Sequence, residues 1–427
     1  MKHVGENIKR IRTAKKMTIS DLANEHVSRG MISLIENGKT QPSIERLHHI
    51  AVQLDVDITE LVEEISKEKL RSKINEAFEL LNRHDVDDVL ATISLLQPLL
   101  KKLDQSYEAA RIYELYAKSL YHLYVYSNEA YLKIEENKWE QYVEKAIAIY
   151  VNLQMEWRVI KLWLFLANIE FRRANYRETI AIIDEGLDNL TIKDSLETKA
   201  TYIELMFGKI STLISMGETL KAHELLDETI DFSRMNLVFI NYYSLLNMKA
   251  WLYYDEQKYD EARKYVADAT SFVQLVKKED LFIEHEGTKI LIEEFFEGNY
   301  ENAIQLESEF ERYLLNESTI QDSIKEEIMV FTRNVKARAL TRLARYEEAQ
   351  TLFKENQIVM NDFMEMAPLD VAIREISKSY EALCHFHLGD AAKAQQLARH
   401  VVDKLHKMPY SSFYHFAREV LADVMRG

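Results

Sequence analysis

The scarcity of proline and glycine is the feature of this sequence that most restricts its fold. The 427 residues include only 4 Pro and 10 Gly, where average usage would give about 21 and about 30. No Pro lies between Pro98 and Pro368, and no Gly lies between Gly38 and Gly186. Because these residues interrupt helices and build the turns of sheet proteins, the sequence disfavours a β-sandwich, a doubly wound α/β fold and a Gly-rich phosphate loop. We therefore expect an all-α protein.

Composition narrows the class of protein further. Hydrophobic residues make up 47% of the chain, which is enough for a folded interior. The single cysteine, Cys384, cannot form an internal disulfide, and we find neither a run of about 20 apolar residues nor a secretion signal. We expect a protein of the cytoplasm, in a reducing environment, without a membrane segment.

Charge is divided unevenly along the chain. Residues 1–50 carry nine Lys and Arg against five Asp and Glu, a formal charge of +4. The other 377 residues carry 45 basic against 65 acidic side chains, or −20. The N-terminal segment is therefore the part best suited to approach polyanionic DNA, whereas the acidic remainder would be repelled by it.

The first 60 or so residues predict five short helices. Apolar residues recur at helical spacing over residues 4–11, and Thr18, Ser28 and Ser43 are typical N-cap residues for the next three helices. A fifth helix is expected from Ile58. Five helices in about 65 residues can form one small core, so we place a first domain at 1–66.

This segment resembles the helix-turn-helix of the Cro and phage-repressor family, and the resemblance is carried by residues 28–39 followed by Pro42 and Ser43. It implies that the helix after Ser28 enters the major groove, where Arg29 can contact guanine, while the helix after Thr18 crosses the backbone. The expected DNA-binding residues are Thr18, Ser28, Arg29, Gly30, Ser33, Lys39, Thr40 and Ser43. Arg29 and Ser33 could instead be ordinary helix residues.

Two further sets of residues in this segment receive structural interpretations. Arg12 and Glu36 match positions that pair inside this fold, so we assign them to its stability. His48 and His49 are expected on a helix surface, because no metal-ligand spacing surrounds them.

Beyond residue 66 a six-residue turn signature recurs. Its copies lie at 174–179, 217–222, 257–262, 298–303, 344–349 and 389–394, with a weaker copy ending at Ala146. They resemble the turn of the tetratricopeptide repeat, where a small residue lets two helices approach closely. Together with less regular segments at 70–103 and 107–135, they predict eight or nine helix pairs in a second domain at 67–427. Such an array is expected to coil into a right-handed superhelix with a concave surface.

The inward-facing repeat positions select the candidate ligand residues. An Asn amide can bond both sides of a peptide group, Arg suits a carboxylate, and aromatic side chains offer apolar pockets. The expected peptide-binding residues are Asn168, Arg172, Asn247, Trp251, Tyr254, Thr288, Asn334, Arg338 and Arg342. Each of them could instead be a helix-packing or solvated residue.

The sequence contains none of the catalytic motifs that we considered. We find no His-Glu-x-x-His, no Cys pair, no nucleophile elbow and no Walker loop. Cys384 is interpreted as a packed core thiol despite the nearby His385 and His387. We therefore expect no enzyme activity, no cofactor and no metal.

A phage-repressor-type helix-turn-helix followed by a long tetratricopeptide array resembles the RRNPP family of peptide-sensing regulators, and the repeat number is most similar to the NprR-like group. The resemblance implies a quorum-sensing transcription regulator that binds duplex DNA and a short imported signalling peptide, and that forms homo-oligomers, a dimer or, with peptide, a tetramer. For NprR-like members it also implies inhibition of a sporulation phosphorelay response regulator in the peptide-free state. The alternative is a repressor whose repeats bind a folded protein partner, with no peptide ligand.

Overall fold

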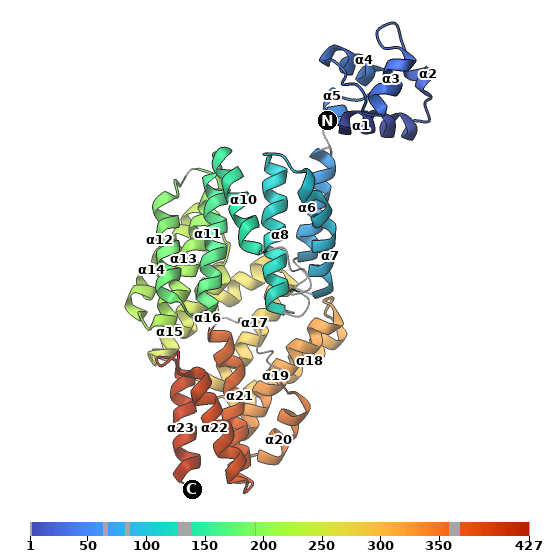
Figure 1. Ribbon diagram of the computed structural model, residues 1–427. Coiled ribbons are helices and arrows are strands. Elements are labelled where there is room, and N and C mark those ends of the chain that lie inside the picture. Colours follow the sequence, from blue (N-terminus) through green and yellow to red (C-terminus); the bar gives the residue numbers. More distant parts are fainter. Residues whose placement is uncertain are drawn as a thin grey trace. The chain divides into compact units, whose positions relative to one another are not determined.

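The computed structural model describes residues 2–62, 67–81, 86–126, 131, 138–192, 194–357 and 368–426 (Figure 1). Every regular element in these ranges is a helix, so the predicted all-α class is confirmed. None of the described helices is both long and apolar enough to cross a bilayer.

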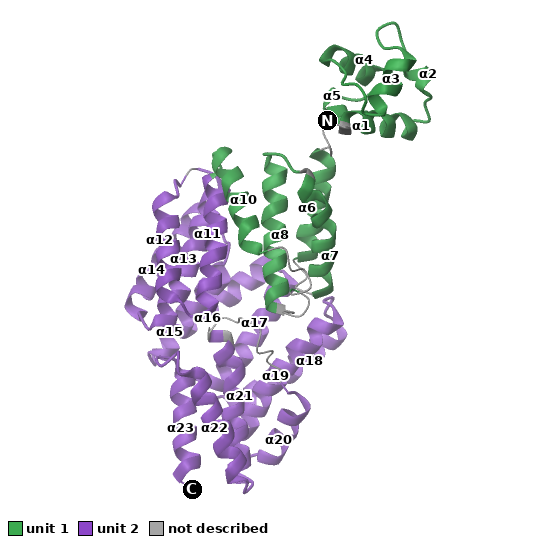
Figure 2. Cartoon of the chain, in the orientation of Figure 1, with its two compact units in different colours: residues 1–155 green, residues 156–427 purple. Residues whose placement is uncertain are grey.

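The chain divides into two compact units, residues 1–155 and 156–427 (Figure 2). The domain boundary expected at residue 66 falls inside the first unit, next to residues 63–66, which lie outside the described ranges. That boundary stays a prediction.

Residues 2–62 form the five expected short helices: α1 (Lys2–Ala14), α2 (Ile19–Leu22), α3 (Arg29–Glu36), α4 (Ile44–Leu54) and α5 (Ile58–Val62). Each helix contributes at least one fully buried side chain to a shared core, namely Ile8, Leu22, Ile32, Leu54 and Leu61. The helix α1 crosses α3 at Gly5, where a Cβ atom would lie 1.9 Å from the carbonyl oxygen of Ile35. Only glycine permits this approach.

The described residues in the remainder of the first unit form two helix pairs. Its elements are α6 (Lys67–Leu81), α7 (Val86–Leu96), the short helix η1 (Gln97–Lys102), α8 (Tyr107–Tyr126) and α10 (Trp139–Asn152). The buried carboxylate of Glu114 on α8 accepts hydrogen bonds from Arg111, Lys118 and the Tyr150 hydroxyl. This network ties α8 to α10.

The second unit contains six helix pairs and a final single helix within its described residues. They are α11 (Glu156–Arg172), α12 (Tyr176–Asn189), α13 (Leu196–Met216), α14 (Thr219–Asn236), α15 (Tyr242–Asp255), α16 (Tyr259–Val276), α17 (Glu279–Leu291), α18 (Tyr300–Asn316), α19 (Asp322–Arg342), α20 (Tyr346–Glu355), α21 (Pro368–His387), α22 (Ala391–Leu405) and α23 (Ser412–Arg426). A π-helical turn, η2 (Ile292–Phe296), extends α17. With the two pairs at 67–152, the described repeats number eight, as expected.

The six predicted turn signatures all join the two helices of a pair, and their first residues share one backbone conformation. The φ angles are 61° at Ala174, 78° at Gly217, 59° at Gln257, 67° at Gly298, 57° at Ala344 and 93° at Gly389. This left-handed residue ends the first helix, as is common at helix C-termini. The last signature residue is buried in every copy, at Thr179, Ala222, Ala262, Ala303, Ala349 and Ala394, because the two helices approach closely there.

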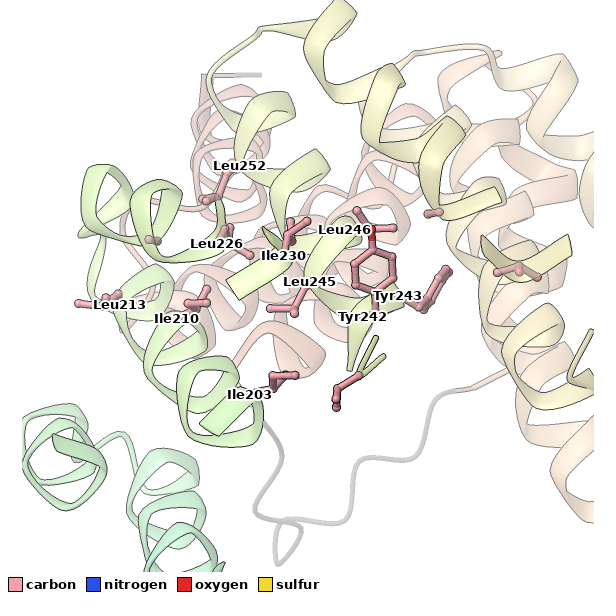
Figure 3. Close-up of a cluster of buried hydrophobic side chains, with 14 residues drawn as sticks. Ile203, Ile210, Leu213, Leu226, Ile230, Tyr242, Tyr243, Leu245, Leu246 and Leu252 are labelled. Atoms are coloured by element: carbon pink, nitrogen blue, oxygen red, sulfur yellow. The ribbon is translucent and has the colours of Figure 1, made fainter. Parts of the chain in front are cut away.

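The core of the second unit runs through the faces that successive pairs share. Figure 3 shows one stretch of it, where Ile203 and Ile210 of α13 and Leu226 of α14 pack with Leu245 and Leu246 of α15. Farther along, Cys384 is buried against the Thr341 hydroxyl, with Oγ1 and Sγ 3.2 Å apart. Burial raises the pKa of this thiol to about 11, which agrees with its interpretation as a packed core residue.

Candidate functional site

The DNA-facing candidates cluster at helix N-termini of the first 62 residues. Thr18, Ser28 and Ser43 are the N-caps of α2, α3 and α4, and each side chain accepts a hydrogen bond from the backbone N–H three residues on. Thr18 forms a complete capping box with Asp21. All three caps remain exposed, so they leave the N-termini of these helices open to solvent.

The exposed face of α3 begins with Arg29 and Gly30, and no atom outside the helix would meet a Cβ at Gly30. Ser33, one turn after Arg29, is half-buried, and Asn37 donates to its carbonyl oxygen at 2.7 Å. The remaining candidates, Lys39 and Thr40, follow α3 in the turn before α4.

The Arg12 and Glu36 pair confirms its structural interpretation. The guanidinium donates to both carboxylate oxygens, at 2.7 and 2.8 Å, and to the Met17 carbonyl at 2.8 Å. The hydrogen bond to Glu36 raises the pKa of Arg12. His48 is exposed as expected, but His49 is half-buried and stacks on His26, with ring centroids 3.8 Å apart. Sequence spacing does not predict this ring pair, because His26 and His49 lie on different elements.

Two of the cavities in the second unit adjoin each other. The main cavity, of about 300 Å³, is lined by Ile214, Ser215, Thr219, Ser244, Asn247, Met248, Trp251, Leu252, Asp255, Glu284, Thr288, Leu369, Ile373, Met408, Tyr410 and Ser411. The side cavity, of about 290 Å³, lies between α17, α19 and α21. Both are lined by Trp251, Glu284, Thr288 and Ile373, so these four residues stand at their junction.

Three of the nine predicted peptide-binding residues meet in the main cavity: Asn247 and Trp251 of α15, and Thr288 of α17. Repeat periodicity brings them together, because both helices are the first of their pairs. It did not reveal Asp255 and Glu284, the two acidic residues of the lining, or the 408–411 segment between α22 and α23. That segment is placed by a tertiary contact, since a Cβ at Gly217 would lie 2.4 Å from the Tyr410 ring.

A buried hydrogen-bond chain supports the wall behind Asn247 and Thr288. The hydroxyl of Thr270 donates to the Val266 carbonyl at 2.8 Å, so it accepts from Nε2 of His285 at 3.0 Å. Nδ1 of His285 then accepts from the Tyr243 hydroxyl at 3.3 Å. Burial lowers the pKa of His285 and raises that of Tyr243 to about 12, despite hydrogen bonds from Thr288 and Asn247 that act in the opposite direction.

The two carboxylates of the main cavity reach solvent through the cavity, while its walls remove part of their hydration. This desolvation raises the pKa of both Asp255 and Glu284. The Ser412 hydroxyl donates to Oδ1 of Asp255 and so ties α23 to the end of α15. Among the described residues, the Glu284 carboxylate has no hydrogen-bond or ion-pair partner.

Tyr254 and Arg338 line neither the main cavity nor the side cavity. Tyr254 is buried, donates to Glu297 at 2.7 Å and stacks on Phe296. Arg338 is 0% exposed, and its guanidinium donates to Glu294. Both residues hold the fold in this structure, because helical periodicity alone does not separate the groove face of a helix from the face toward the next pair.

The other four predicted residues are also outside the main cavity. Asn334 is buried, and its amide donates to the carbonyl oxygens of Val330 and Asn356. Arg342 is exposed but donates to the Tyr300 hydroxyl at 3.0 Å. Asn168 and Arg172 are exposed on α11 and line neither cavity.

Comparison with solved structures finds several helical proteins with similar chains. PlcR of Bacillus thuringiensis, in complex with the peptide PapR7 and DNA, is 17% identical, with 65% of this chain and 96% of that chain covered and a TM-score of 0.34. Rgg2, a pheromone receptor of Streptococcus dysgalactiae, is 19% identical. The alignment covers 66% of this chain and 97% of Rgg2, with a TM-score of 0.33. A Rap protein complexed with Competence and Sporulation Factor is 12% identical. The alignment covers 84% of this chain and 98% of the Rap chain, with a TM-score of 0.47.

At these identities and TM-scores, none of the solved chains assigns a ligand to this one. No curated protein matches the sequence. A family model described as helix-turn-helix matches residues 8–61, the segment that contains Arg29 and the α2 and α3 caps. Residues 8–61 are therefore similar to the helix-turn-helix family.

Proposed function

We propose that the protein is a peptide-responsive DNA-binding regulator, in which residues 2–62 bind operator DNA and the main cavity binds a short signalling peptide. The observation that carries the proposal is the convergence of Asn247, Trp251 and Thr288 on one cavity. These residues were selected as peptide contacts from repeat position alone. An amide, an indole and a hydroxyl on one wall can bond a peptide backbone and accept an apolar side chain.

We expect Arg29 to contact a base and Lys39 to contact the phosphate backbone. Arg29 opens the exposed face of α3, so we expect Arg29→Ala to cost about 1–3 kcal/mol at one base position and to relax specificity there. Lys39→Ala is expected to weaken binding to all sequences and to reduce the salt slope by about 1. Binding isotherms on operator variants at several salt concentrations separate the two effects.

Peptide binding and DNA binding are coupled if the peptide favours one conformation of the repeat array. A peptide that contacts several helix pairs favours one pitch of the array, and with it one oligomer and one spacing of paired DNA-binding modules. Half-sites lie about 34–36 Å apart, so a small change of spacing alters DNA affinity. We propose a dimer that becomes a tetramer with peptide and, as in NprR-like proteins, inhibition of a sporulation phosphorelay response regulator by the free form.

The test begins with selection of a binder from a random heptapeptide library on the full-length protein. Mass in solution and operator affinity are then measured with and without that peptide. We expect Asn247→Ala to abolish both peptide responses and to keep basal DNA binding, while Asn316→Ala, an exposed Asn on α18, behaves as wild type. Unchanged mass and DNA affinity at saturating peptide would contradict the proposal.

A second candidate is favoured by three exposed apolar side chains near the C-terminal ends of α14 and α16. Met235, Leu237 and Leu275 are between 76% and 84% exposed, and an array of helices can bind a folded protein through such a surface. On this alternative the repeats bind a protein partner, and Leu237→Ser rather than Asn247→Ala disrupts regulation.

A further inference from the structure

The charges around the two cavities are almost all negative. Within the described lining of both cavities, the charged residues are Asp255, Glu284, Glu327 and Arg374. The one cation is already paired, because the Arg374 guanidinium lies 3.2 Å from Oε1 of Glu327. Two carboxylates, Asp255 and Glu284, therefore face the ligand space without a basic partner in the lining.

The arginines that the sequence suggested for a ligand carboxylate do not offset this charge. Arg338 is enclosed and paired with Glu294. Arg342 donates to Tyr300 and lies over the Phe416 ring, 5.8 Å from its centroid. The third predicted arginine, Arg172, lies on α11. None of the three lines the main or the side cavity, so an acidic ligand would meet carboxylates of the same sign.

Of the carboxylates in the lining, Glu284 is the one best placed to pair with a charged ligand group. It lies at the junction of the two cavities together with Trp251, Thr288 and Ile373. Asp255, in contrast, already accepts a hydrogen bond from Ser412. Partial desolvation destabilises the ionised form of a carboxylate that has no partner. A cation that reaches it stabilises that form through a charge-assisted hydrogen bond.

The rest of the lining defines what must accompany the positive charge. Ile214, Met248, Leu252 and Met408 make most of the main cavity wall apolar, and methionine adapts to side chains of different shape. A ligand group with an apolar stem and a cationic tip fits both features.

We infer that the cavity selects a cationic oligopeptide, in which a lysine or arginine side chain or the free N-terminal amine pairs with Glu284 and neighbouring apolar side chains fill the main cavity. This inference rests on the proposed function and specifies its ligand. Glu284 is then the residue that determines ligand charge, whereas Asn247 and Thr288 contact the backbone.

The experiment uses synthetic heptapeptide pools in which one position is fixed as Lys, norleucine or Glu and the others are equimolar mixtures. Each pool is made with a free and with an acetylated N-terminus, which separates a side-chain cation from the terminal amine. Affinities for the full-length protein are measured by isothermal titration calorimetry. We expect the best Lys pool, or the free-amine form of the norleucine pool, to bind about tenfold tighter than its uncharged counterpart.

Variants connect this preference to one carboxylate. Glu284→Gln is expected to remove the preference, and Glu284→Lys to favour the Glu pool. Glu301→Gln is the control, because it removes an exposed carboxylate of α18 that lines neither cavity and should keep the preference. Circular dichroism verifies that each variant is folded.

The outcomes separate this inference from the proposed function. If acetylated Glu pools bind wild type as tightly as acetylated Lys pools and acetylation does not weaken the norleucine pool, or if Glu284→Gln keeps the preference, the charge inference is wrong while peptide binding stands. If no pool binds, both are wrong.

Discussion

The imidazole of His285 is 3% exposed and lies between two hydroxyl groups, those of Tyr243 and Thr270. Its lowered pKa means that the unfolded chain takes up a proton before the folded chain does as pH falls below the ordinary value of 6.5. The free energy of unfolding contributed by this site is therefore present above pH 6.5 and decreases as pH falls.

We predict that His285→Gln, which retains a donor and an acceptor, reduces the loss of stability between pH 7 and pH 5.5. Urea unfolding at the two pH values measures it. His48→Gln on the exposed face of α4 serves as control and should keep the wild-type difference. Equal pH dependence in wild type and His285→Gln would refute the assignment.

Arg338 illustrates how burial changes the role of a charged residue. Its partner Glu294 is 1% exposed and lies in the π-helical turn η2, and burial together with the charge of Glu294 raises the pKa of the neighbouring Tyr380. Removing one member of a buried ion pair leaves an uncompensated charge and costs about 3–5 kcal/mol, whereas replacing both with apolar residues costs less.

We therefore predict that Arg338→Met lowers the free energy of unfolding by about 3–5 kcal/mol, and that Arg338→Met with Glu294→Met lowers it less than the single change does. Denaturant unfolding of both single variants and the double variant completes the cycle. Additive losses would show that the two side chains do not interact.

At the scale of helices, glycine has opposite roles at two positions of the helix-turn-helix. Gly5 lies where α1 meets backbone atoms of α3, and backbone atoms cannot move aside as a side chain can. Gly30 lies within α3 and has open space around it. Since alanine is the better helix former, the same substitution should act in opposite directions.

We predict that Gly5→Ala destabilises residues 2–62 by about 1–3 kcal/mol or more, from overpacking. Gly30→Ala should stabilise α3 by about 0.5–1 kcal/mol. Amide hydrogen exchange in α1 and α3 reports both effects. Similar protection in wild type and Gly5→Ala would contradict the close crossing.

At the scale of the whole array, Tyr410 and Ser412 connect the last helices to α13 and α15, which lie about 160–200 residues earlier in the sequence. Gly217 and Gly389 both have positive φ, but only Gly217 faces a side chain, the Tyr410 ring. The two glycines therefore form a matched pair for measuring this long-range contact.

We predict that Gly217→Ala and Gly389→Ala share a backbone cost of about 1 kcal/mol, and that Gly217→Ala costs about 1 kcal/mol more from overpacking. The excess should vanish in the Tyr410→Ala background. Thermal unfolding of the four single and double variants measures it. An unchanged excess without the Tyr410 ring would refute the contact.

The sequence was sufficient for the features that repeat or that depend on local backbone chemistry. Six turn signatures predicted six helix joints, because a left-handed residue and a small buried residue are local requirements of the joint. The Arg12 and Glu36 pair followed from the helix-turn-helix pattern. Of the nine predicted peptide-binding residues, Asn247, Trp251 and Thr288 line the main cavity, since helical period alone selects a helix face only coarsely.

What only the tertiary structure decided is which charges remain available. In the sequence Arg338, Glu284 and Asp255 are equivalent as charged helix residues. Packing encloses Arg338 against Glu294 and leaves Glu284 at the cavity junction. It also brings residues 408–411 to the cavity wall. Local sequence determines helices and turns because their hydrogen bonds span a few residues. The sign and shape of the cavity instead depend on contacts between different helix pairs.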